Sequence, residues 1–443
     1  MKRSIALMVA TALVLCGCAA DTPNDTVTTS ATETNVTVVT TEVGNDVVTT
    51  NTAKTEGTLN STAATKTTGV ITQKTTTVKT TAKTETNNPN TVTLTEPANG
   101  YFVEAQSDMV EEYMSITDEK KAAEFWVASY SGFAQAASFT ARWESKGMLW
   151  RVYVSEDPTF KDVEGILTTT KWMRITNLMP GRTYYWKVVN GFGEESEVRS
   201  VTVEKTQVRW IEAPDSDNIR DMGGWKTESG KTVKYELLYR GGCLDGYNGG
   251  PKLNGEGIKV LRDQLGIRTE IDLRGSDSVS TTSPFGVTYV NAPITQYDYI
   301  YNSSTTKTAI GTIFKTMSKE ENYPILFHCN AGADRTGTLA FLVNGLLGVS
   351  QQDLTRDFEL TGFSKRGKRL RAKLEMDTLT FSEDGVMQYG GSNYIAWGPL
   401  HDTMMKKYGT GSGKLSDAIA NFLKTECGVT QSEIDSIRRI MLK

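Results

Sequence analysis

The chain has 443 residues and a formal net charge of −4 at pH 7. Since no basic tail accompanies that charge, we expect no nucleic acid partner. The chain has only two histidines and its five cysteines form no CxxC pairs, so we expect no metal site and no cofactor.

The N-terminus has the pattern of an export signal. A basic start precedes an apolar stretch over residues 5–15, which is too short for a stable membrane span. Residues 15–18, Leu-Cys-Gly-Cys, resemble a bacterial lipobox, whose cysteine is lipidated as the signal is removed. The resemblance implies a lipoprotein signal peptide over residues 1–18 and a lipid on Cys18. The protein would then be secreted and anchored by that lipid to the outer face of a bacterial cell membrane. Simple cleavage and release is the alternative.

Residues 19–95 are dominated by threonine, with asparagine, valine, lysine, alanine and glutamate. Such a composition cannot bury enough apolar area to offset the entropy of ordering the chain. We predict a disordered stalk, and the lack of a clean repeat disfavours a threonine-rich solenoid.

Residues 96–207 alternate polar and apolar side chains in short stretches, as half-buried strands do. Residues 178–188, Leu-Met-Pro-Gly-Arg-Thr-Tyr-Tyr-Trp-Lys-Val, resemble the tyrosine corner of fibronectin type III domains and the strand that follows it. The resemblance implies an all-β sandwich in which Tyr184 hydrogen-bonds to the chain just upstream and Trp143 lies in the core. We expect this sandwich to act as a spacer. Aromatic residues used as a carbohydrate platform are the alternative.

Residues 208–443 alternate strand and helix patterns. Strands are expected over 267–273 and 287–290, and helices over 257–265 and 310–317. This order predicts an α/β domain with a parallel-rich sheet flanked by helices.

One loop in this domain has the residues that phosphoryl transfer through a thiol requires. Residues 328–337 read His-Cys-Asn-Ala-Gly-Ala-Asp-Arg-Thr-Gly and lie between an apolar strand pattern and a helix pattern. The loop should turn its backbone N–H groups inward around a phosphate, and the same field favours the thiolate of Cys329. Arg335 can bind two phosphate oxygens, and Thr336 can donate a hydrogen bond to the sulfur. The predicted phosphate-binding residues are Asn330, Ala331, Gly332, Ala333, Asp334 and Arg335.

The loop resembles the signature of cysteine-dependent protein tyrosine and dual-specificity phosphatases, in particular the bacterial family whose loop ends Asp-Arg-Thr-Gly. Residues 218–224, 238–242 and 269–274 are similar to further motifs of that family, and the resemblance covers about 210–443. It implies a protein-tyrosine-phosphatase-like hydrolase. Relatives often carry lysine where this chain has Ala333, a lysine associated with binding extra phosphates on inositol lipids.

Two aspartates could protonate the leaving oxygen. Asp334 lies inside the loop, and the equivalent family residue has been assigned to catalysis. Asp298 lies 31 positions before Cys329, close to where dual-specificity phosphatases place a mobile acid loop. Either could instead be structural, and we favour Asp334.

Three residues could support the loop. His328 is expected to fix the backbone of the cysteine and tune its reactivity. Arg220 and Asp221 could bind substrate or form a buried ion pair at a Gly-Gly turn.

These observations favour a cell-surface phosphatase that acts on phosphotyrosine, with phosphoserine, phosphothreonine or phosphoinositide as further possible substrates. Its partner would be a phosphorylated protein or a small phosphomonoester. An inositol polyphosphate or phytate phosphatase is the alternative enzyme. A non-catalytic surface binding protein is the remaining alternative, and intact Cys329 and Arg335 argue against it.

Overall fold

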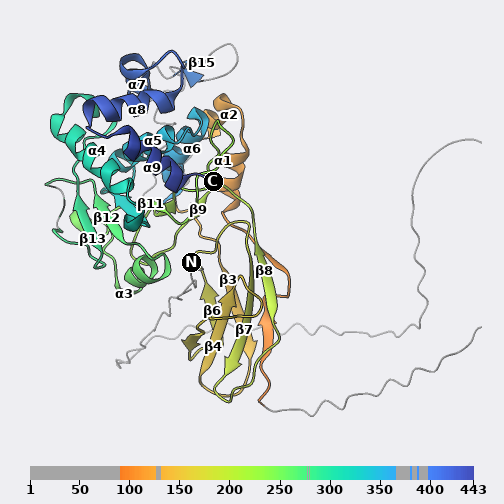
Figure 1. The fold of residues 1–443 in the computed structure, drawn as a ribbon. Coiled ribbons are helices and arrows are strands. Elements are labelled where there is room, and N and C mark those ends of the chain that lie inside the picture. Colours follow the sequence, from red (N-terminus) through yellow and green to blue (C-terminus); the bar gives the residue numbers. More distant parts are fainter. Residues whose placement is uncertain are drawn as a thin grey trace, which may run out of the picture. The chain divides into compact units, whose positions relative to one another are not determined.

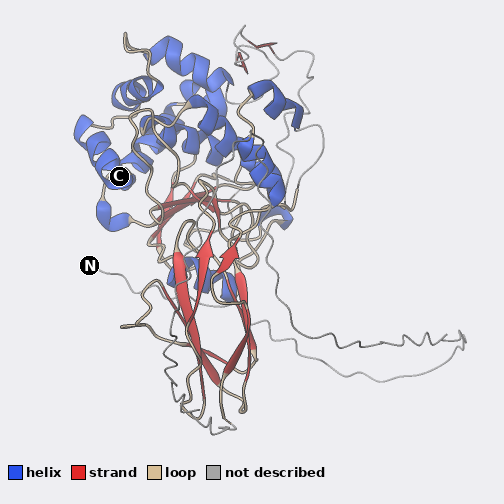
Figure 2. Ribbon diagram, turned by 90° about the vertical axis from the view of Figure 1, so that its right-hand side faces the viewer, coloured by secondary structure: helices blue, strands red, loops and turns tan. Residues whose placement is uncertain are grey.

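We describe the protein from a computed structural model, which places residues 90–125, 131–276, 278, 280–365, 380–381, 387–388 and 398–443 (Figures 1 and 2). The expected signal peptide with Cys18, and the expected stalk up to residue 89, lie outside these residues. Among the residues that are described, none belongs to a helix that is both long and apolar enough to cross a bilayer.

The N-terminal part contains two β-sheets. Strands β1 (Thr93–Glu96), β3 (Phe139–Glu144) and β6 (Trp172–Ile175) form a sheet in the order β1-β3-β6. The other sheet has the order β2-β8-β7-β4-β5, built from β2 (Tyr101–Val103), β4 (Trp150–Ser155), β5 (Ile166–Thr168), β7 (Thr183–Asn190) and β8 (Arg199–Val203). Strand β1 begins three residues before the stalk boundary that the sequence suggests.

The alternation of apolar residues along these strands produces the core between the sheets. Strand β7 alternates partly buried and buried positions over all eight residues, and Trp143 and Trp186 are almost completely buried. The backbone N–H of Met179 donates to the hydroxyl of Tyr184 at 3.0 Å, which is the upstream contact expected of this tyrosine.

This part of the chain is not all-β, contrary to the expectation from its sequence. Helices α1 (Asp108–Ser115) and α2 (Glu119–Phe125) lie between β2 and β3. We call residues 104–125 and 131–138 the helical insertion. On α1, Val110 and Tyr113 are buried, and both belong to the apolar core of the C-terminal domain. A helix with two inward apolar residues in eight gives a weak periodic signal.

The C-terminal domain is built on a six-stranded mixed sheet in the order β13-β12-β14-β11-β10-β9. Strands β11 (Leu238–Gly241), β12 (Thr269–Asp272), β13 (Thr288–Asn291) and β14 (Ile325–His328) are parallel. Strands β9 (Arg209–Trp210) and β10 (Arg220–Asp221) add an antiparallel edge. Both central strands, β11 and β14, are buried at every position, as helix-covered parallel strands are.

Helices and short helical turns connect and cover these strands. They are η1 (Tyr247–Gly249), α3 (Gly255–Ile258), η2 (Lys259–Gln264), η3 (Tyr297–Asn302), α4 (Ser304–Met317), η4 (Glu320–Asn322), α5 (Asp334–Leu346), α6 (Gln351–Glu359), η5 (Leu360–Phe363), α7 (Gly398–Tyr408), α8 (Leu415–Glu426) and α9 (Gln431–Met441). A two-stranded sheet pairs β15 (Thr380–Phe381) with β16 (Met387–Gln388). The single helix predicted over 257–265 is divided into α3 and the π-helical η2.

Candidate active site

The signature loop connects the central strand β14 to the helix α5. Strand β14 ends at His328, and α5 begins at Asp334, so Arg335 and Thr336 lie in its first turn. Cys329 is only 2% exposed, whereas Arg335 is half-buried. The strand–loop–helix arrangement expected from the sequence is therefore present, with Cys329 at the end of the strand and Arg335 at the start of the helix.

The carbonyl groups of this loop are held on its outer side. The carbonyl of residue 330 accepts a hydrogen bond from the backbone N–H of Cys243 at 2.8 Å. The carbonyls of residues 331 and 332 each accept from Nδ2 of Asn218 at 3.1 Å, and the latter also accepts from Arg240 at 3.0 Å. In a trans peptide the N–H points opposite to the C=O. The N–H groups of residues 331–333 therefore point into the loop, where they can bind an anion.

Gly332 is required by this geometry. Its φ is +68°, in the left-handed region. A Cβ atom here would lie 2.7 Å from the carbonyl of Gly241 and 2.8 Å from Nδ2 of Asn218. Any side chain would therefore displace the groups that hold the loop.

A buried cluster of charges lies behind the loop. Asp357 is paired with Nε of Arg220 at 3.3 Å and with Arg240, and all three side chains are at most 5% exposed. Thr361 accepts hydrogen bonds from Asn218 and Arg220 at 3.3 Å each. Burial and the neighbouring Arg240 lower the pKa of Arg220 to about 9, so it keeps its charge at neutral pH. The carboxylate thus connects two arginines, one of which contacts the loop directly.

Arg220 and Asp221 do not form an ion pair with each other. Asp221 pairs with Arg209 at 3.0 Å and accepts from the N–H of Gly223 at 2.9 Å, which fixes the Gly-Gly turn. Arg220 is instead paired with Asp357 and lies 5.3 Å from the ring of Trp210. Both residues are at most 3% exposed, so their positions fit a supporting role better than substrate contact.

His328 is completely buried beside the nucleophile. Its Nε2 lies 2.9 Å from Oε1 of Glu270, and its Nδ1 lies 3.4 Å from the carbonyl of Cys329. Burial disfavours the imidazolium, but the hydrogen bond and charge of Glu270, together with Asp272, outweigh it and raise the pKa of His328 above 6.5. The ring is therefore held between a buried carboxylate and the backbone of the cysteine.

Glu270→Gln is expected to lower the pKa of His328, because the hydrogen bond can persist while the charge is lost. The imidazole C–H signals in an NMR titration measure the pKa of His328 directly. The chain has only two histidines, so the signal that disappears in His401→Gln belongs to His401 and the remaining one to His328. Because the folded-state pKa is raised, the charged pair stabilises the protein fully below about pH 6.5. That contribution is lost as the pH rises through the raised value. A His328 signal titrating at or below 6.5 in the unmodified chain would contradict this account.

The two candidate acids have different surroundings. The carboxylate of Asp334 accepts a hydrogen bond from the hydroxyl of Tyr297, whose backbone N–H donates to Thr338 at 2.8 Å. Tyr297 has a φ of +56°, which is uncommon for an aromatic residue. Asp298 follows it in η3 and is half-buried. The segment that carries Asp298 thus contacts the signature loop through Tyr297.

One further prediction concerns the thiol of Cys329. The hydroxyl of Thr336 lies 3.5 Å from the carbonyl of Gly241, so its hydrogen bond to the sulfur stays a prediction. Cys243, Cys329 and Cys427 are free thiols. Among the described residues, His, Cys, Asp and Glu form no group of three suited to a metal ion.

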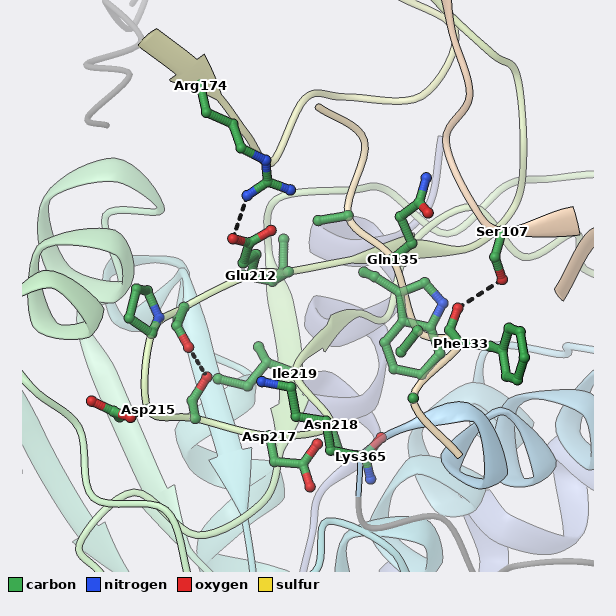
Figure 3. A pocket seen from close by; sticks show the side chains of 18 residues that line it. Ser107, Phe133, Gln135, Arg174, Glu212, Asp215, Asp217, Asn218, Ile219 and Lys365 are labelled. Carbon is green, nitrogen blue, oxygen red and sulfur yellow. Dashed lines mark hydrogen bonds and ion pairs between the residues drawn. The ribbon is translucent and has the colours of Figure 1, made fainter. Parts of the chain in front are cut away.

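A cleft of about 490 Å³ lies beside Asn218, which contacts the signature loop (Figure 3). The helical insertion lines it with Phe133 and Gln135, and the segment 210–219 lines it from the C-terminal domain. Arg174 and Glu212 form an ion pair at its edge. Asn218, which holds the loop carbonyls, also lines this cleft.

The sequence did not identify Glu270 or Asp357 as parts of the site. Glu270 shares the predicted strand 267–273 with the charged residues Arg268 and Asp272, so its charge alone did not distinguish it. Asp357 lies in a helix whose polar sequence, Gln-Gln-Asp-Leu-Thr-Arg-Asp-Phe-Glu, is typical of a solvated face. Only the folded chain brings them to the loop.

Comparison with known proteins places this site in a family. The sequence pattern described as "Tyrosine phosphatase family" matches residues 211–443, which is more than half of the chain. The search of curated proteins found no match. Among solved structures, the chain is similar to the catalytic core of the PP-IP phosphatase SIW14 from S. cerevisiae, with 17% identity, coverage of 33% of this chain and 80% of that one, and a TM-score of 0.23. It is also similar to the structure of TpbA of P. aeruginosa in complex with pTyr, with 15% identity, coverage of 34% of this chain and 80% of that one, and a TM-score of 0.22.

Proposed function

Because this chain belongs to the tyrosine phosphatase family and is a phosphoric monoester hydrolase, we propose that it dephosphorylates phosphotyrosine through a cysteinyl-phosphate intermediate on Cys329. One observation carries the proposal. The buried thiol lies at the start of a loop whose carbonyls are held outward and whose N–H groups therefore face inward.

The reaction would proceed in two displacements. The sulfur of Cys329 attacks phosphorus, the bond from phosphorus to the ester oxygen breaks, and its electron pair stays on that oxygen, which takes a proton from an aspartic acid. Water then attacks the phosphorus of the thiophosphate, the sulfur leaves as thiolate, and the proton of the water returns to the carboxylate. The inward N–H groups and Arg335 stabilise the equatorial oxygens in both steps. Uncatalysed phosphate monoester hydrolysis is extremely slow, so this electrostatic stabilisation must be large.

Asp334 is the proposed proton donor. Asp334→Asn should lower kcat strongly for a substrate with a poorly acidic leaving alcohol and weakly for one with an acidic leaving phenol, because only the former needs the proton. Asp298→Asn is the matched variant and should leave that ratio unchanged. Activity that survives Asp334→Asn but collapses in Asp298→Asn would assign the role to Asp298 instead.

The position of the thiol favours phosphotyrosine over phosphoserine. Cys329 is only 2% exposed, so a phosphate carried on a long side chain reaches it more easily than one on a short side chain. Ala333 supplies no cation for a second phosphate, which disfavours inositol polyphosphates. Phosphoserine, phosphothreonine and simple phosphoinositides are secondary candidates.

We further propose that this activity lies outside the cell. The lipobox-like residues 15–18 support a lipid anchor on Cys18, and the threonine-rich segment supports a stalk that ends before β1. The two sheets and the Met179–Tyr184 contact support a fibronectin type III-like domain that extends from β1 to about residue 207. The catalytic domain would occupy 208–443.

Phosphate release by the full chain under reducing conditions tests the proposed substrate. A phosphotyrosine peptide, a phosphoserine peptide, a phosphoinositide and phytate would be compared side by side. We expect kcat/KM for the phosphotyrosine peptide to exceed kcat/KM for each of the other three substrates by about tenfold or more. Preference for phytate would favour an inositol phosphate phosphatase, and no turnover by the folded chain would contradict the proposal.

A further inference from the structure

We infer that the helical insertion of the β-sandwich supports the phosphate-binding loop of the C-terminal domain, with Tyr113 as its main positioning residue. The inference rests on the proposed function of that loop. It gives the sandwich a supporting role for this loop, whereas from its sequence we expect a spacer.

Tyr113 lies inside the C-terminal domain rather than on the sandwich surface. It is 1% exposed, and its hydroxyl donates a hydrogen bond to the carboxylate of Glu359 at the end of α6. Its ring centre lies 5.7 Å from that of Phe363 and 5.5 Å from that of Phe125. The apolar core that contains Tyr113 also contains Leu360 and Phe363. The phenol therefore anchors the junction between α6 and η5.

Further contacts hold both ends of the α6–η5 segment. The backbone N–H groups of Gly132 and Ala134 donate to the carbonyl of Phe363 at 3.0 and 2.9 Å. At the other end, Gln352 donates to the carbonyl of residue 117 at 3.0 Å, and Arg356 donates to that of residue 116. The insertion thus binds this segment from Gln352 to Phe363.

The same segment carries the groups that hold the loop. Asp357 and Thr361 lie two residues before and two residues after Glu359. Asp357 forms ion pairs with Arg220 and Arg240, and the hydroxyl of Thr361 accepts a hydrogen bond from Asn218. Asn218 and Arg240 then hold the outward carbonyls of residues 331 and 332. A shift of the α6–η5 segment would therefore move the carbonyls whose orientation turns the N–H groups inward.

Tyr113→Phe in the full chain tests this connection. Removal of one hydrogen bond should lower kcat/KM for a phosphotyrosine peptide by roughly threefold to tenfold. It should also weaken inhibition by inorganic phosphate by a similar factor, because the same N–H groups bind both ligands. The matched control is Tyr184→Phe, which removes a buried phenol hydrogen bond within the sandwich. This control should lower the thermal midpoint while leaving both kinetic quantities unchanged for the folded protein.

A second pair of variants covers the case in which Tyr113→Phe does not fold. Glu359→Gln keeps an oxygen that accepts from the phenol and should retain phosphate inhibition, whereas Glu359→Ala should weaken it. The inference is wrong if the unmodified chain is active and Tyr113→Phe stays within twofold of it in both kcat/KM and inhibition by inorganic phosphate. Glu359→Ala is judged in the same way if Tyr113→Phe does not fold. If the unmodified chain shows no turnover, the proposed function fails, and the rise in thermal midpoint with inorganic phosphate still compares the variants.

Discussion

Cys329→Ser is expected to abolish phosphate release, with kcat falling by about 10⁴-fold or more. Serine places a hydroxyl where the reaction needs an ionisable thiol, and a hydroxyl is a poor nucleophile at neutral pH without an adjacent base. The exchange changes one buried atom, so the thermal midpoint should shift little. Initial rates on a phosphotyrosine peptide, with thermal unfolding of the same samples, measure both quantities.

Cys427→Ser is the matched control for this variant. Cys427 is also a buried free thiol, but it lies at the end of α8, and its backbone packs against Gly311 of α4. The control should retain the activity of the unmodified chain. Activity of Cys329→Ser within a factor of ten of the control would exclude the thiol as the nucleophile.

Asp357→Ala is expected to lower the free energy of unfolding by about 3–5 kcal/mol. Its carboxylate is 5% exposed and lies between Arg220 and Arg240, so its removal leaves two guanidinium groups buried without their common counter-ion. Denaturant unfolding measures the loss. Asp263→Ala is the control, because Asp263 pairs with Arg262 at the surface, and that change should cost less than about 1 kcal/mol. Equal losses in the two variants would contradict the role given to the buried cluster.

The parts of the fold that the sequence predicts are those that local patterns determine. The catalytic loop follows an apolar strand and precedes an apolar helix within about twenty residues, so its neighbours in sequence are also its neighbours in space. The parallel strands 269–272 and 288–291 fall inside or within one residue of the predicted stretches. The burial of Trp143 likewise follows from the alternation of its strand, and the hydrogen bond of Tyr184 joins residues only five positions apart.

The supporting groups could not be predicted in the same way because they are brought together over long separations. Tyr113 and Glu359 are 246 positions apart, and Arg220 and Asp357 are 137 positions apart. Glu270 reaches its histidine across adjacent parallel strands. Nothing within a local window indicates which charged residue of a helix turns inward, or that an insertion in one domain completes the core of another.

Isolation of the covalent intermediate tests the central claim most directly. The full chain would be mixed with a phosphotyrosine substrate and stopped by a rapid denaturing quench, and its peptides would be analysed by mass spectrometry. We expect a phosphoryl group on the peptide that contains Cys329, resistant to hydroxylamine and absent from Cys329→Ser. Turnover without a phosphorylated cysteine, or a hydroxylamine-sensitive phosphoryl group on an aspartate, would contradict the account.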